Sequence, residues 1–105
     1  MTSRYIAVYI TASNVKEAEK IAGVLLKERL IACANITNIK SAYWWRGRIQ
    51  RHGEALLIAK TKRNLMKKII ATVKKHHSYS KPCVNALPIL EGNPDYLKWI
   101  DKETK

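Results

Sequence analysis

Two cysteines and one histidine are the residues of this chain best suited to bind a metal ion. Cys33 lies between alanines in an apolar segment. Cys83 directly follows a proline and lies six positions after His77. Thiolate and imidazole are ligands that copper and zinc prefer. These three residues therefore form a candidate soft-metal set. The alternatives are an ordinary buried thiol for Cys33, a packed or exposed thiol for Cys83, and a helix C-terminal imidazole for His77.

The spacing of these residues excludes several common kinds of site. Neither cysteine belongs to a C-x-x-C pair, which excludes zinc-ribbon and thioredoxin motifs. The chain also lacks a P-loop, a G-x-G-x-x-G sequence, an H-E-x-x-H sequence and a Ser-His-Asp order. We therefore expect a binding protein rather than an enzyme, with no required cofactor and with copper or zinc as the possible metals.

A second candidate set, formed by Lys60, Trp45 and Tyr79, suits an anionic ligand. Lys60 ends an apolar segment of the strand type. Its amine either extends to solvent or lines a cleft between subunits. Trp45 and Tyr79 are either interface or core aromatics, or the walls of that same ligand cleft.

The net charge is unusually positive. Twenty Lys and Arg residues against eight Asp and Glu give a formal charge of +12. Between positions 29 and 90 there are thirteen basic residues and a single acid, Glu54. Such a surface attracts polyanions and small anions. The aromatic signature of an RNA-recognition motif is missing, so sequence-specific nucleic-acid binding is not expected.

Hydrophobic periodicity indicates alternating strands and helices. Asn14, with Glu17 three residues later, predicts a capping box at the start of a helix. Thr61 is expected to cap the next helix, and Asn93 the last one, with Pro94 in its first turn. We expect strands over 5–11, 31–44, 49–60 and 82–90, and helices over 15–30, from 61 onward and from 94 onward. We also expect a turn at 46–48 and a bulge or kink at 52–53.

The order β-α-β-β-α-β with an added C-terminal helix is the pattern of the α+β, ferredoxin-like sandwich. No linker or repeat interrupts it, so we expect one domain over residues 1–105. Two helices cover only one face of a four-stranded antiparallel sheet. The opposite face should also be apolar, because both sides of the expected strands are. The third strand carries Leu56 and Ile58 opposite Ala55, Leu57 and Ala59, and the fourth carries Val84 and Ala86 on one side and Leu87 and Ile89 on the other. Soluble monomers avoid such exposed surface, so self-association is expected.

Three consecutive aromatic residues, Tyr43, Trp44 and Trp45, lie at the tip of the expected hairpin. The flanking strands are long for this domain, so the tip should project beyond the helices and contact a partner subunit. The alternative is a tip that folds onto its own domain. No apolar run approaches the ~18 residues of a membrane helix, and the N-terminus reads as a strand rather than a signal peptide. We expect a cytoplasmic protein without a membrane partner.

Five segments resemble the CutA divalent-ion tolerance family, in that family's order and spacing. They are residues 28–36 (ERLIACANI), 43–49 (YWWRGRI), 54–61 (EALLIAKT), 77–82 (HSYSKP) and 92–100 (GNPDYLKWI). The resemblance implies a ferredoxin-like fold and a tight homotrimer, similar in architecture to the PII signalling proteins. It also implies a link to tolerance of copper and other divalent metals, without a settled enzymatic activity.

The chain departs from that family's pattern where metal binding is concerned. Ser80 and Cys83 stand where the family often has acids, and the hairpin tip, often acidic in the family, carries Arg46, Arg48 and Arg51. Fewer carboxylates disfavour magnesium, calcium and manganese, whereas the thiols favour soft metals. Two hypotheses follow: a trimeric metal-tolerance protein that binds soft metal ions or signals, and a PII-like sensor that binds an anionic metabolite in basic intersubunit clefts.

Overall fold

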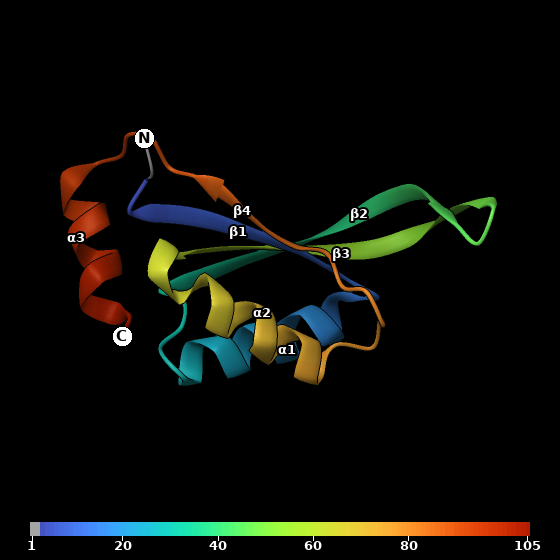
Figure 1. Cartoon of the computed structure of the whole chain (residues 1–105), viewed down its shortest axis with the longest axis horizontal. Helices are drawn as coiled ribbons and strands as arrows, with labels where there is room; N and C mark the ends of the chain where they lie inside the picture. The colour runs from blue at the N-terminus through green and yellow to red at the C-terminus, as the bar shows by residue number, and fades with distance from the viewer. Residues whose placement is uncertain (1–2) are drawn as a thin grey trace.

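A four-stranded antiparallel sheet in the order β2-β3-β1-β4 forms the centre of the molecule. The computed structural model describes residues 3–105, and in it α1 and α2 cover one face of the sheet while α3 lies at the end opposite the hairpin (Figure 1). The predicted ferredoxin-like fold is confirmed. The elements are β1 (Tyr5–Ala12), α1 (Val15–Lys27), β2 (Cys33–Trp45), β3 (Arg48–Lys62), a 3₁₀ turn (Arg63–Leu65), α2 (Met66–His76), β4 (Val84–Pro88) and α3 (Pro94–Glu103).

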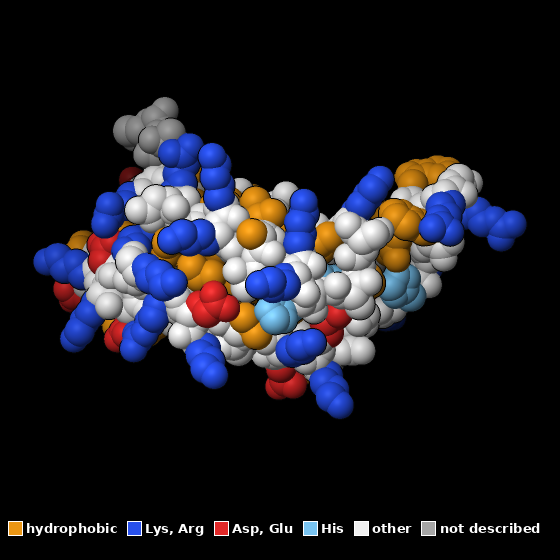
Figure 2. Space-filling view, turned by 60° about the horizontal axis from the view of Figure 1, so that its bottom comes forward, with side chains coloured by type: hydrophobic (Ala, Val, Ile, Leu, Met, Phe, Trp, Pro, Cys, Tyr) orange, Lys and Arg blue, Asp and Glu red, His pale blue; other side chains and the backbone are white. Residues whose placement is uncertain are grey.

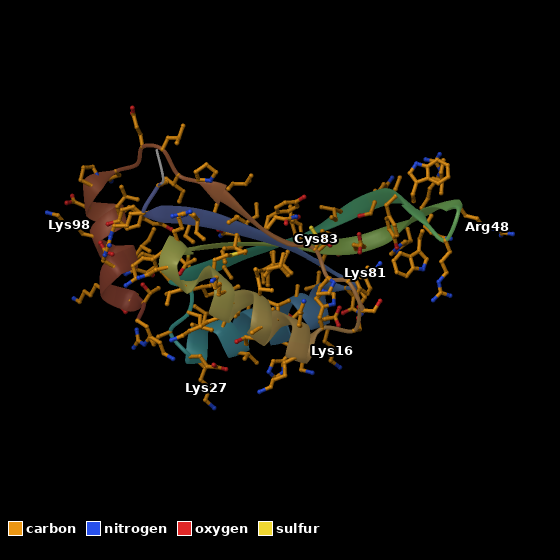
Figure 3. All side chains as sticks on the ribbon, in the orientation of Figure 1. Lys16, Lys27, Arg48, Lys81, Cys83 and Lys98 are labelled. Carbon is orange, nitrogen blue, oxygen red and sulfur yellow. The ribbon has the colours of Figure 1, made fainter. Side chains whose placement is uncertain are left out.

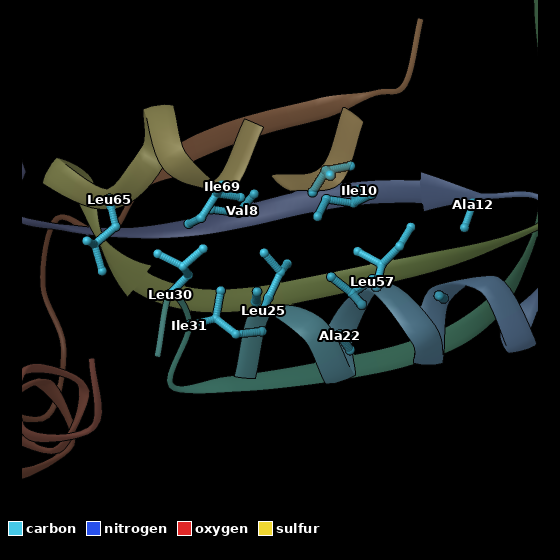
Figure 4. Close-up of a cluster of buried hydrophobic side chains, with 14 of the residues drawn as sticks. Val8, Ile10, Ala12, Ala22, Leu25, Leu30, Ile31, Leu57, Leu65 and Ile69 are labelled. Atoms are coloured by element: carbon cyan, nitrogen blue, oxygen red, sulfur yellow. The ribbon is translucent and has the colours of Figure 1, made fainter. Parts of the chain in front are cut away.

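The core lies between the sheet and the two helices. Every second residue of β1, from Ile6 to Ala12, is buried, which is the period of a strand with one covered face. Leu25 of α1 and Ile69 of α2 are fully buried against this row (Figure 4). The apolar periodicity of the sequence therefore marks the covered face correctly.

The N-terminus of α1 carries the predicted cap in a slightly different form. The Asn14 side chain accepts a hydrogen bond of 2.8 Å from the Glu17 backbone N–H. Glu17 reaches back one residue beyond the cap, because its Oε1 accepts from the Ser13 N–H at 2.9 Å. The Glu17 carboxylate therefore lies over the chain that enters the helix.

The β2–β3 hairpin runs without interruption from Cys33 opposite Lys60 to Trp45 opposite Arg48. The predicted bulge is wrong, because residues 52 and 53 keep their places in this ladder. The turn needs positive φ at its two central residues, and these are 52° at Arg46 and 77° at Gly47. The hairpin extends well past the helices, as predicted, and gives the molecule its length of 44 Å (Figure 1).

The start of α2 and the extent of β4 differ from the prediction. Thr61 does not cap a helix: it is a buried residue of β3, and its hydroxyl donates to the Leu30 carbonyl at 2.6 Å. The 3₁₀ turn then precedes Met66, the first residue of α2. β4 begins at Val84 and ends at Pro88, two residues later and two residues earlier than the predicted strand over 82–90. No helix within residues 3–105 is long and apolar enough to cross a membrane.

We call the face of the sheet away from α1 and α2 the open face. Its side chains are fixed by the register: Ala7, Tyr9 and Thr11 of β1 lie opposite the even-numbered residues of β3 and the odd-numbered residues of β4. Leu87 is 55% exposed there and Ile58 is 36% exposed. The sheet is thus apolar on both faces, as the sequence predicts, and one of the two is uncovered in the single chain.

Candidate functional site

A hollow of about 680 Å³ opens on the open face, between the end of β1 and the projecting hairpin. Its walls come from β1, from the hairpin and from the segment between α2 and β4, which passes this point in Figure 3, where Lys81 and Cys83 are labelled. We call this hollow the cleft. Its lining includes Tyr9, Lys40, Trp45, Glu54, Tyr79, Lys81 and Cys83.

The cleft contains a buried carboxylate held by a tyrosine. The Tyr79 hydroxyl donates a hydrogen bond of 2.6 Å to Glu54 Oε2, and Glu54 is only 7% exposed. Burial, together with this hydrogen bond to an anion, raises the pKa of the Tyr79 hydroxyl, so Tyr79 stays protonated and remains a donor. None of the ion pairs among residues 3–105 includes Glu54. The carboxylate is therefore stabilised by a neutral hydroxyl and lacks a cationic partner in the single chain.

His77 fixes the segment that carries Tyr79. Its Nδ1 accepts from the Tyr79 backbone N–H at 3.0 Å, which places the ring proton on Nε2. Nε2 lies 2.7 Å from the Thr11 carbonyl oxygen and so donates to it. The imidazole is completely buried, and both of its nitrogens are used by the backbone. His77 can bind a metal only if it gives up one of these two bonds.

A second anchor of the same segment is Glu17. Its Oε2 accepts from the Ser78 backbone N–H at 2.9 Å, and its Oε1 accepts from Ser13. Burial by itself would raise the pKa of this carboxyl, but the hydrogen bonds from Ser13 and Ser78 outweigh burial and lower the pKa from 4.5 to about 2. The start of α1 and the wall of the cleft are thereby joined through one ionised side chain.

The two thiols lie at distant places on the open face. Cys83 lines the cleft and accepts from Asn85 Nδ2 at 3.4 Å. Cys33 begins β2 and lies 3.2 Å from the Tyr96 hydroxyl of α3. That contact and, to a smaller extent, burial raise the pKa of the Tyr96 hydroxyl to about 12. Both cysteines are free and half-buried.

One chain does not assemble the predicted soft-metal set. Cys33 and Cys83 belong to opposite edges of the sheet, since β2 and β4 are its outer strands. Three strand spacings alone separate them by about 14 Å. Within residues 3–105 there is no group of three or more His, Cys, Asp and Glu side chains placed to hold a metal ion. A metal site that used these thiols would need ligands from another copy of the chain.

The predicted ligand-cleft set is brought together only in part. Trp45 and Tyr79 line the cleft. Lys60 does not, because it lies further along β3, opposite Cys33, where its amine donates to Asn35 Oδ1. The lysines of the cleft are Lys40 and Lys81.

Sequence reasoning missed the role of Glu54, although a signal was present. Glu54 is the single acid between positions 29 and 90, and it starts an apolar strand segment. An isolated carboxylate in such a place is expected to have a specific partner. That partner, Tyr79, lies 25 positions further along the chain and could not be found from spacing.

The aromatic hairpin tip projects into solvent in the single chain. Trp44 is 72% exposed, and Tyr43 and Trp45 are each more than a third exposed. Tyr43 contacts His52 across the strands, with 2.5 Å between the hydroxyl and Nε2. The Arg46 guanidinium lies 5.6 Å from the Trp45 ring centre. The Trp44 side chain therefore lies mostly in solvent in the single chain, which agrees with the predicted projection of the tip.

A ferredoxin-like sandwich with an uncovered apolar face and a cleft beneath a long hairpin defines a distinct class of small α+β protein. A family model described as CutA1 divalent ion tolerance protein matches residues 6–103. The chain belongs to this family.

Relatives from archaea and plants agree with this assignment. Divalent-cation tolerance protein CutA of Archaeoglobus fulgidus is 44% identical over 95 residues, which cover 90% of this chain and 93% of that protein. Protein CutA 1, chloroplastic, of rice is 43% identical over 101 residues, which cover 95% of this chain and 57% of the rice protein. The solved structure described as the periplasmic divalent cation tolerance protein CutA from Archaeoglobus fulgidus superimposes with a TM-score of 0.94 at 42% identity, covering 96% of this chain and 99% of that one.

Proposed function

We propose that this protein serves divalent-cation tolerance as a homotrimer that acts by binding soft metal ions or by signalling, and not by catalysis. The observation that carries the proposal is the open face, which is apolar, uncovered and the location of both free thiols. We also propose that the protein works in the cytoplasm, where both thiols would stay reduced and able to bind metal.

Trimer formation would cover the open face and the aromatic tip together. Leu87 and Trp44 are far more exposed than large apolar side chains normally are. Covering them should bury well over ~1,000 Å² at each interface, as permanent contacts do. Light scattering at micromolar concentration tests this step: a stable particle of 12.0 kDa, the mass of one chain, would overturn it.

Metal binding in the proposed trimer would use thiols of more than one protomer. Cys83 at the cleft and Cys33 at the start of β2 both lie on the surface that assembly would bring against another copy. Cu(I) and Zn²⁺ prefer such sulfur ligands, whereas Mg²⁺ and Mn²⁺ prefer oxygen. The strongly positive charge further disfavours weakly held divalent cations.

Calorimetric titration of the reduced protein tests the metal proposal. Copper or zinc should bind more tightly than manganese, and Cys83→Ser should weaken copper binding by at least tenfold. Binding should tighten as pH rises through the thiol range, because the thiolate is the ligand. His77→Ala should leave copper affinity unchanged, because both nitrogens of the imidazole are already bonded to the backbone in the parent protein. Manganese binding as tight as copper binding would contradict the proposal.

Anion binding in the cleft is the second candidate function. It is favoured by Lys40 and Lys81, two exposed lysines that line the cleft without forming an ion pair within residues 3–105. In an assembled trimer the cleft would lie between protomers, as in the PII-like hypothesis. Protection of the protein from thermal unfolding by small carboxylates or phosphates, reversed by Lys81→Ala, would support this candidate over the metal.

A further inference from the structure

We infer that the cleft selects an amphoteric small molecule, one that carries an amino group for Glu54 and an acidic group for Lys81. This inference rests on the proposed ligand-binding function of the same cleft and narrows it. A simple anion satisfies Lys81 but brings a second negative charge toward a buried carboxylate. A simple cation satisfies the carboxylate but must pass the lysines of the cleft.

The Glu54 carboxylate is buried without a balancing cation. Glu54 is only 7% exposed, and Tyr79 is the one hydrogen-bond partner of its carboxylate within residues 3–105. The bond to Tyr79 uses Oε2, so Oε1 keeps its acceptor capacity. A buried carboxylate is costly without a charged partner or several donors. An ammonium group supplies both charge and donors in one ligand atom.

The walls of the cleft favour the same group. Tyr9, Trp45 and Tyr79 line it together with Glu54. Aromatic faces attract ammonium ions, and more strongly where water is partly excluded. Tyr79 cannot replace the missing cation, because a tyrosine hydroxyl donates a hydrogen bond but carries no positive charge.

Lys81 supplies the opposite end of the site. It lies on the segment between α2 and β4 and lines the cleft (Figure 3). Lys40 also borders the cleft, but its place opposite Gly53 in the hairpin starts its side chain toward the other face of the sheet. Lys81 is exposed and free of ion pairs among the described residues. A carboxylate or phosphate on the ligand would meet Lys81 while its amine meets Glu54. A volume of about 680 Å³ lies within the usual range for small-molecule sites.

A series of straight-chain ω-amino acids with four to eight carbons measures this site directly. Each is titrated into the intact protein at low salt by calorimetry, beside the alkylamine and the carboxylic acid of equal length. At one chain length the amino acid should bind at least tenfold more tightly than either matched compound, because each end makes a charge-assisted contact. This comparison uses the unaltered protein and does not depend on whether a variant folds.

Variants then assign the two ends. Glu54→Gln keeps an acceptor for Tyr79 but removes the charge, so it should abolish the advantage of the amino acid over the acid. Lys81→Ala should abolish the tighter binding of the amino acid relative to the alkylamine of equal length. Lys98→Ala is the matched control, because Lys98 lies on α3 at the far end of the molecule (Figure 3), and it should change neither ratio.

The possible failures are distinguishable. If the acid alone binds as tightly as the amino acid, and Glu54→Gln changes nothing, the amphoteric ligand is overturned while anion binding in the cleft stands. If no compound of the series binds but copper binds through Cys83, the inference is overturned and the metal proposal stands. If neither the series nor any metal binds, both are overturned.

Discussion

Glu17 and Ser78 lie 61 positions apart in the sequence, yet the Ser78 backbone N–H donates to the Glu17 carboxylate at 2.9 Å. This bond joins the first turn of α1 to the segment that carries Tyr79 and Cys83. The cleft wall is therefore held by the helical layer as well as by the sheet. The same carboxylate therefore binds the residue before the helix cap, Ser13, and the wall of the candidate binding site.

Stability should depend on Glu17 in acid. The pKa of its carboxyl is lowered from 4.5 to about 2 in the folded chain, so its contribution is fully present above pH 4.5 and is lost as pH falls toward 2. Glu17→Gln should cost about 1–3 kcal/mol at neutral pH. Urea unfolding at pH 7, 4 and 2 checks this, and the difference between the two proteins should shrink with each step. A difference that is constant across this range would contradict the role of the ionised carboxylate.

Tyr79→Phe should destabilise the protein by about 1–3 kcal/mol, because it leaves the buried Glu54 carboxylate without its donor. Tyr9→Phe is the control, since the Tyr9 hydroxyl makes no hydrogen bond within residues 3–105 although the ring lines the same cleft. It should change the free energy of unfolding by less than about 0.5 kcal/mol. Equal losses in the two variants would show that the Tyr79 contribution is packing alone.

Two glycines should respond in opposite directions to alanine. Gly23 is an exposed residue inside α1 with no atom within 4 Å of an added Cβ, so Gly23→Ala should stabilise by about 0.5–1 kcal/mol. Gly47 has equal space but a φ of +77°, so Gly47→Ala should destabilise by about 1 kcal/mol. Thermal unfolding of both variants beside the parent gives the two signs. Stabilisation by both would mean that the hairpin turn tolerates an L-residue without strain.

Removal of the exposed indole should weaken assembly. In the proposed trimer Trp44 contacts a neighbouring protomer, so Trp44→Ala should shift the association equilibrium toward smaller species by at least tenfold. Sedimentation over a range of concentrations measures this. Lys67→Ala, an exposed substitution on α2, serves as the comparison and should leave the equilibrium unchanged.

Retention on immobilised heparin should fall steeply with salt. Lysines and arginines are spread over the helical face, where they outnumber the acidic residues (Figure 2). Contacts between such a surface and a polyanion release counterions, so affinity should decrease in proportion to a power of salt concentration. Retention that is nearly independent of salt would point to a partly buried anion site instead, and no retention at low salt would mean a merely hydrated surface.

The fold could be predicted because its signals are local. Alternation in β1, the cap at Asn14 and the Asn93-Pro94 start of α3 each depend on neighbouring residues, and each is confirmed. The prediction for Thr61 is wrong because the sequence alone does not distinguish a hydroxyl that caps a helix from one buried in a strand. The difference depends on the Leu30 carbonyl, which accepts the hydrogen bond of Thr61 from 31 positions away.

The site was predicted less completely because its contacts are long-range. Trp45 and Tyr79 share the cleft, but pairing in the sheet places Lys60 elsewhere. The imidazole of His77 resembles a metal ligand in sequence, whereas the folded chain uses both of its nitrogens for backbone. Nothing local to the sequence around Glu54 indicates that a tyrosine from another element would meet it.

The unbroken hairpin ladder restricts how its length can change by insertion or deletion. Thirteen consecutive pairs join β2 to β3 around a turn of two residues. Loss of a single residue from one strand would reverse the facing of every side chain between that point and the turn, and would move Trp45 and Glu54 to opposite sides of the ribbon. Equal losses from both strands would preserve the facing. Tolerated changes of hairpin length should therefore come in matched pairs, one residue from each strand. Such pairs shorten or lengthen the hairpin without changing the face on which each side chain lies.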